Sequence, residues 1–168
     1  MRISNLIGAA LSLIAAGCAD NRAPVAKGPQ PVQWSADVAS QTPSADGTVL
    51  VNLRLKAVIQ DGWHVYSLTQ KSGGPTPLSV KVDSSSLLSI GSEVQGPAPQ
   101  KALDPNFGVE TETYSGAPVI TVPVRVSSGA LKSGKPIEVK VRSQACSDNF
   151  CLPATTSTIS VALPPDKS

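Results

Sequence analysis

Cys146 and Cys151 are the residues whose types and spacing most directly suggest chemistry. They lie in residues 144–153, which read QACSDNFCLP, and are close enough to pair with each other. A disulfide that closes so short a loop stabilises the fold by roughly 2 kcal/mol. Stabilisation of the fold is therefore a weak explanation for the presence of this cysteine pair. A pair at a surface turn can instead open and close without unfolding the domain, as thiol-disulfide exchange requires. A static clip in an exported protein is the competing interpretation.

The N-terminal residues have the features of a bacterial export signal. Arg2 supplies a positive charge, and residues 6–17 form an apolar run too short to span a bilayer. Small residues directly precede Cys18, which resembles the lipobox cut by lipoprotein signal peptidase. We therefore expect a signal peptide over residues 1–17 and a lipid on Cys18. Ordinary secretory cleavage is the alternative, and it would leave Cys18 as an odd thiol in an oxidising compartment.

Composition and charge narrow the remaining function classes. The chain has 14 basic and 12 acidic residues among 168, and removal of the leader would take away only Arg2 among them. So small a net charge gives no indication of a nucleic-acid partner. Two cysteines and one distant histidine do not supply four zinc ligands, so we expect no metal and no other cofactor. A second histidine or a nucleophile motif for hydrolase chemistry is also lacking.

The elements that must position the cysteines are β-strands. Residues 18–31 are rich in proline and predict a flexible tether, residues 32–163 a single domain, and residues 164–168 a tail. Apolar residues alternate with polar ones in residues 49–59, the pattern of a half-buried antiparallel strand. Further strands are expected at 63–67, 78–82, 118–126, 136–144 and 156–163. With no helical period of ten residues outside the leader, the pattern predicts an all-β sandwich.

Three expectations about individual residues follow from this frame. Pro123 lacks an N–H, which favours an edge strand or a bulge for its segment. On the strand from 136, the residues opposite the apolar set are polar, and the same parity continues to Cys146, which predicts that Cys146 faces solvent at one arm of a hairpin. Trp34 and Trp63 are expected to pack in the core.

The sequence resembles the N-terminal domain of the thiol:disulfide interchange protein DsbD. The resemblance is carried by residues 61–70 (DGWHVYSLTQ), 73–77 (GGPTP) and the cysteine segment ending in Cys-Leu-Pro, in the order found in that family. It covers roughly residues 32–163. The resemblance implies an immunoglobulin-like antiparallel β-sandwich that takes electrons from a membrane-embedded partner and passes them to oxidised periplasmic proteins.

The same resemblance assigns roles to residues. Cys151 would attack the partner and Cys146 would resolve the mixed disulfide. A cap loop shields the pair in this family, and residues 104–108 are the best local match, with Phe107 as the shield or as a minor core residue. His64 or Tyr66 would hydrogen-bond a thiol, although a lone histidine is more often structural. Asp104 would accept a proton or be a solvated loop charge.

The expected partners follow from the domain and from its leader. They are a membrane-embedded thiol reductase or a thioredoxin-like protein, oxidised envelope clients, and the membrane through the anchor. Because the chain has no C-x-x-C motif or span of its own, we expect a separate protein to supply the electrons. Ala19 stands where aspartate would signal inner-membrane retention, so the outer membrane is slightly favoured. The alternative function is an Ig-like binding module or a structural envelope lipoprotein with a static disulfide.

Overall fold

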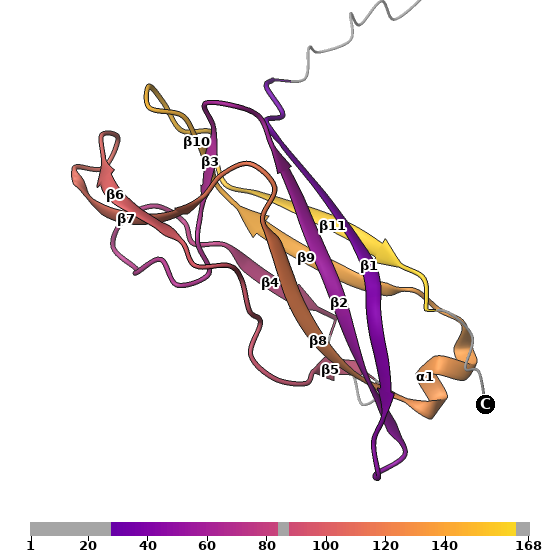
Figure 1. The fold of residues 1–168 in the computed structure, drawn as a ribbon. Helices are drawn as coiled ribbons and strands as arrows, with labels where there is room; N and C mark the ends of the chain where they lie inside the picture. The colour runs from indigo at the N-terminus through magenta and orange to yellow at the C-terminus, as the bar shows by residue number, and fades with distance from the viewer. Residues whose placement is uncertain (1–27, 84–87, 164–168) are drawn as a thin grey trace, which may run out of the picture.

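Antiparallel strands make up most of the domain. The computed structural model describes residues 28–83 and 88–163 (Figure 1). The strands are β1 (Val32–Pro43), β2 (Thr48–Ile59), β3 (His64–Tyr66), β4 (Ser79–Val82), β5 (Leu88–Ile90), β6 (Gln100–Asp104), β7 (Val109–Tyr114), β8 (Val119–Ser127), β9 (Ile137–Ser143), β10 (Ala145–Cys146) and β11 (Thr155–Val161). A short helix, α1 (Ser128–Ser133), is capped by the hydroxyl of Ser127 and ends at Gly134.

The strands form sheets of order β1-β2-β8-β5, β11-β9-β4 and β10-β3-β7-β6. The first two enclose the core, because the inward sets of β2, β8 and β9 are fully or almost fully buried. Their inward residues include Val51, Leu53, Leu55, Ile120, Val122, Val124, Ile137, Val139 and Val141. The third sheet continues from one end of this sandwich, where the β6–β7 and β10 hairpins project together (Figure 1). The predicted fold class is confirmed as an all-β sandwich of antiparallel sheets.

Strong alternation located β2, β8, β9 and β11 within one or two residues of their observed bounds. Strands β1, β5, β6 and β7 were not predicted. Pro123 lies in β8, which is central, and the β2–β8 pairing has no register shift, so neither the expected edge strand nor the expected bulge is present. The proline is tolerated because its missing N–H faces the side where β5 has already ended at Ile90, and there Gly91 donates to the Pro123 carbonyl at 2.9 Å.

The predicted exposure of Cys146 is also wrong, since its side chain is 0% exposed. The alternation of β9 holds through Ser143, where the strand ends. After Gln144 the chain joins a different sheet, in which β10 pairs with β3. Because of this change of sheet, the alternation of inward and outward side chains along β9 no longer applies at Cys146, and its side chain points inward.

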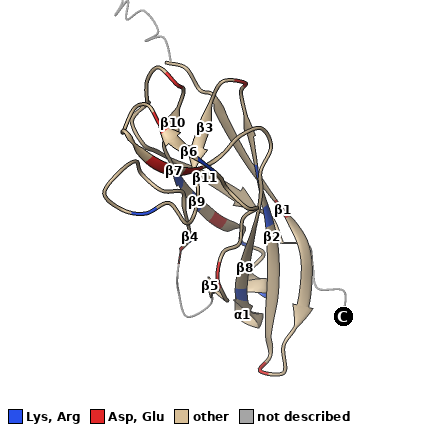
Figure 2. Ribbon diagram, turned by 60° about the vertical axis from the view of Figure 1, so that its left-hand side comes forward, with Lys and Arg blue, Asp and Glu red and all other residues tan. Residues whose placement is uncertain are grey.

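The predicted signal peptide at 1–17, the lipid site at Cys18, most of the tether at 18–31 and the tail at 164–168 lie outside the described residues. In the part of the chain that is described, no helix has the length and apolar character needed to cross a membrane. Acidic and basic residues are spread over several strands in Figure 2, in keeping with the small net charge of +2.

Candidate functional site

The cysteine pair closes the base of a tight hairpin. Cys146 and Cys151 are joined by a disulfide with their Cα atoms 4.1 Å apart, and they face each other as an antiparallel bridge. Ser147 N donates to the Phe150 carbonyl at 2.9 Å, and Leu152 N donates to the Ala145 carbonyl at 2.9 Å. The predicted hairpin bridge between two arms is therefore present.

The two sulfur-bearing residues differ in their access to solvent. Cys146 is fully buried, whereas Cys151 is partly exposed. Of the two residues, only Cys151 has surface that a partner can contact without rearrangement of the hairpin. The geometry therefore favours attack at Cys151 and leaves Cys146 as the inner cysteine.

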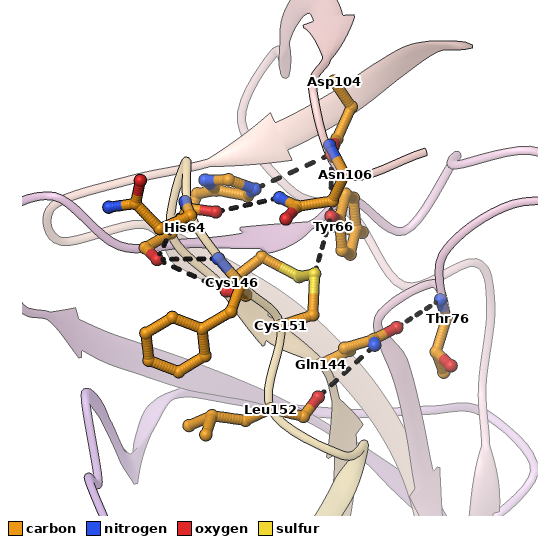
Figure 3. Close-up of a disulfide and its surroundings, with 12 residues drawn as sticks. His64, Tyr66, Thr76, Asp104, Asn106, Gln144, Cys146, Cys151 and Leu152 are labelled. Atoms are coloured by element: carbon orange, nitrogen blue, oxygen red, sulfur yellow. Dashed lines mark hydrogen bonds and ion pairs between the residues drawn. A yellow bond between two sulfur atoms is a disulfide. The ribbon is translucent and has the colours of Figure 1, made fainter. Parts of the chain in front are cut away.

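Strand β3 lies next to the cysteine hairpin and carries the side chains closest to the disulfide (Figure 3). Cys146 pairs directly with His64, and Tyr66 is two residues further along the same strand face. The phenol oxygen of Tyr66 lies 3.8 Å from Cys151 Sγ. The rings of His64 and Tyr66 pack edge to face, with centroids 5.4 Å apart. The residues 63–67, whose strand was predicted, thus lie against both cysteines.

Asp104 is a buried carboxylate next to Tyr66 of β3 and not a solvated loop charge. It is 3% exposed and accepts a hydrogen bond of 2.7 Å from Tyr66 Oη. Burial alone would raise the pKa of Asp104, but hydrogen bonds from Tyr66 and Asn106 and the proximity of His64 hold it below its ordinary value. Burial, followed by the bond to Asp104 and its charge, raises the pKa of Tyr66. Tyr66 therefore stays protonated and donates to Asp104.

His64 is less well satisfied than a structural histidine usually is. Its Nε2 is buried and has no hydrogen-bond partner among the described residues, and it lies 3.9 Å from Asp104 Oδ2. Burial lowers the pKa of His64, although the charges of Asp104 and Asp148 act in the opposite direction. The ring is thus neutral near pH 7, and its approach to Asp104 is not an ion pair there.

The predicted cap loop lies at the tip of the β6–β7 hairpin. Asp104 Oδ1 accepts from Asn106 N at 2.8 Å, and Gly108, with φ of 67°, closes the turn by donating to the Asp104 carbonyl. Phe107 packs edge to face on Tyr66 with centroids 6.0 Å apart and is 38% exposed. It lies in neither the core cluster nor the sandwich and covers the tyrosine that touches Cys151.

Two residues that the sequence did not single out hold the hairpin in place. Asn106 Nδ2 donates to the Ser147 carbonyl at 2.9 Å and so ties the cap loop to the cysteine turn. Gln144 accepts from Thr76 N at 2.9 Å and donates to the Leu152 carbonyl at 3.3 Å. The sequence offered one signal for these roles: Asn106 lies in the predicted cap segment, and Gln144 lies two residues before Cys146.

The predicted core tryptophans are only partly buried. Trp34 in β1 packs against the core cluster. Trp63 also borders that cluster, and its ring meets Phe150 of the cysteine turn edge to face, with centroids 5.3 Å apart. Trp63 therefore links the core to the hairpin. Across the described residues, no group of three or more histidine, cysteine or acidic side chains is placed to hold a metal ion.

Comparison with known proteins finds one matching family and similar solved structures. The family model described as thiol:disulfide interchange protein DsbD, N-terminal, matches residues 31–163. The solved DsbD N-terminal domain of Neisseria meningitidis, in the reduced form, is 20% identical with a TM-score of 0.45, covering 74% of this chain and 83% of that one. ACE19, the collagen-binding subdomain of the Enterococcus faecalis surface protein ACE, is 11% identical with a TM-score of 0.34, covering 82% and 99%. No curated protein sequence matches.

Proposed function

Because this chain belongs to the family of the DsbD N-terminal domain, we propose that it is a thiol-disulfide exchange domain. In this proposal a membrane-embedded reductase or a thioredoxin-like protein reduces the Cys146–Cys151 pair, and the pair then reduces oxidised proteins of the cell envelope. The observation that carries the proposal is a disulfide at a hairpin base that joins one fully buried and one partly exposed cysteine. A static clip would not need this asymmetry.

The exchange runs through a mixed disulfide in each direction. A donor thiolate attacks Cys151, Cys146 leaves with the electron pair, and the donor's second thiolate then releases Cys151. In client reduction the Cys151 thiolate attacks the client disulfide, and Cys146 then attacks Cys151 to release the reduced client. Phe107, Tyr66 and Asp104 would shield and orient the exposed sulfur.

Trapping of the mixed disulfide tests this assignment. In Cys146→Ala the resolving thiol is missing, so the variant should accumulate mixed disulfides with envelope proteins, visible by non-reducing electrophoresis. Cys151→Ala is the matched control and should accumulate few, because its remaining thiol is buried. If neither variant traps a partner, the binding-module or structural alternative with a static disulfide gains support. If only Cys151→Ala does, the two roles are exchanged.

We further propose that the domain faces the periplasm from a lipid on Cys18, with residues 18–31 as tether. The lipobox-like residues before Cys18 support this, and Ala19 favours the outer membrane. Metabolic labelling with a fatty-acid analogue should tag the full chain but not Cys18→Ser. Labelling that persists in Cys18→Ser would contradict the anchor.

A further inference from the structure

His64 lies opposite the buried cysteine of the pair. It is the direct partner of Cys146 in the β10–β3 ladder. Opposed residues of antiparallel strands project from one face, with Cβ atoms about 4.5–5.5 Å apart. Tyr66, on the same face of β3, contacts the other cysteine, Cys151. Strand β3 therefore places one aromatic residue opposite Cys146 and another against Cys151.

The surroundings of the imidazole prepare it to take a proton. Its Nε2 points towards Asp104 Oδ2 at 3.9 Å and has no hydrogen-bond partner in the described part of the chain. A neutral ring with its hydrogen on Nε2, facing the carboxylate, leaves Nδ1 bare. Cys146 opposite His64, with Asp104 at the far side of the ring, supplies the residue types of a nucleophile, a base and an orienting carboxylate.

The inner cysteine needs such a base. Cys146 is 0% exposed, so water does not reach its thiol, and burial disfavours the thiolate. Residues 144–153 contain no lysine or arginine. The charged groups that face His64 are Asp104 from β6 and Asp148 from the cysteine turn, both of which favour a proton on the ring, and Tyr66 of β3 stays neutral.

We propose that His64 is the proton acceptor for Cys146 in the resolving step, an inference that rests on the proposed exchange function. The Cys146 S–H gives its proton to His64 as its sulfur attacks Cys151 in the mixed disulfide. The Cys146–Cys151 bond forms, the bond to the client sulfur breaks, and the client leaves as a thiolate with the electron pair. In the opposite direction the imidazolium returns the proton to the departing Cys146 sulfur.

A chromogenic aromatic disulfide separates the two steps in the reduced protein. Attack by Cys151 releases the first chromophore, and attack by Cys146 on the mixed disulfide releases the second. Loss of a general base should slow the second release in His64→Gln by about tenfold or more, and leave the first release nearly unchanged. Asp61→Asn, which removes an exposed charge from the turn before β3, is the control and should change neither.

The outcomes distinguish this inference from the function on which it rests. If the unaltered protein shows no second release, the pair does not close and the exchange function fails. If the second release is present but His64→Gln leaves it unchanged, or slows both releases equally, the role of His64 is overturned and the exchange function stands.

The pH profile gives an independent measurement should His64→Gln fail to fold. In the unaltered protein, the rate of the second release plotted against pH should show an inflection below pH 6.5, because burial lowers the pKa of His64 from its ordinary value of 6.5. The pKa of Asp104 is lowered and that of Tyr66 raised, so these neighbours titrate on either side of that inflection. A rate that rises steadily with pH, without this inflection, would overturn the proposal.

Discussion

Tyr66 joins the buried acid of the site to the sulfur that partners reach. Its single O–H is committed to Asp104 at 2.7 Å, so it presents only lone pairs to Cys151 Sγ at 3.8 Å. This arrangement suits the oxidised state, in which the sulfur has no charge to stabilise. In the reduced state a Cys151 S–H can donate a hydrogen bond to the same oxygen. The Tyr66 hydroxyl can therefore contact Cys151 in both the oxidised and the reduced protein.

Removal of the Tyr66 hydroxyl should cost stability. Tyr66→Phe keeps the ring and its contact with Phe107, but it leaves the Asp104 carboxylate buried with fewer donors. A hydrogen bond to a charged group contributes about 1.5–3 kcal/mol, so we expect the free energy of unfolding in urea to fall by that amount. Tyr114→Phe is the matched control, since the hydroxyl of this buried tyrosine bonds to the Leu68 backbone and not to a charged group, so its loss should be smaller. An equal loss in both variants would contradict a special role for the buried pair.

Asp104 should also make the fold sensitive to acid. Its pKa is held below the ordinary value of 3.8, so its contribution to stability is complete above that pH and is lost as the pH falls towards the lower folded pKa. Asp104→Asn removes this contribution at every pH. We expect the difference in unfolding free energy between the two proteins to shrink as the pH drops below about 4. Denaturation at several pH values checks this, and a constant difference would contradict it.

At the scale of elements, two hairpins from different parts of the chain meet at the site. The β6–β7 turn carries Asn106 and Phe107, and the β10 turn carries the cysteines. The Asn106 side chain bonds to the Ser147 carbonyl at 2.9 Å and is the direct tie between the two turns. Since Asn106 is itself exposed, water competes for this bond, and the cap can lift at small cost.

Loss of this tie should make Cys151 easier to reach. A hydrogen bond of this kind contributes about 1 kcal/mol, so Asn106→Ala should speed reduction of the oxidised protein by a small dithiol roughly fivefold. Asn149→Ala is the matched control, because the Asn149 side chain is exposed on the cysteine turn and does not bridge to the cap loop. Stopped-flow fluorescence of the nearby Trp63 can follow the reaction. Equal rates in all three proteins would show that the bond does not restrain the cap.

The elements differ in how well the sequence predicted them, for physical reasons. Strand β2 combines a buried face with a mostly polar one, so its period of two is visible. Strand β6 is almost entirely exposed, with only Asp104 buried, and a strand without an apolar face gives no such pattern. The inward turn of Cys146 depends on the switch to the sheet of β3, a tertiary event that local alternation does not encode.

The site was predictable to the extent that its residues lie in recognisable local motifs. Cys146, Cys151, His64, Tyr66, Asp104 and Phe107 were all singled out, and the structure brings them together. The burial of Asp104 and the lack of a partner for His64 Nε2 could not be predicted, because each depends on the assembly of the third sheet, in which β3 and β6 flank β7.

At the scale of the whole molecule, the core and the disulfide contribute very unequally to stability. The two sheets bury a continuous set of valine, leucine and isoleucine side chains, many with no exposed surface. Each full burial of such a side chain contributes about 1.5–3 kcal/mol. The disulfide closes a loop of a few residues at the end of the sandwich, remote from most of that core.

The domain should therefore stay folded when its disulfide is reduced, as a carrier of electrons must. The short loop predicts a loss of roughly 2 kcal/mol in the free energy of unfolding. Urea denaturation with and without a strong reductant measures this difference, with near-ultraviolet circular dichroism as the check on packing. Leu53→Ala, a truncation of a fully buried core residue, provides the comparison and should cost about 2–5 kcal/mol in either redox state. Unfolding of the unaltered protein on reduction alone would show that the bond is a structural staple, and the exchange mechanism would then lack its reduced carrier.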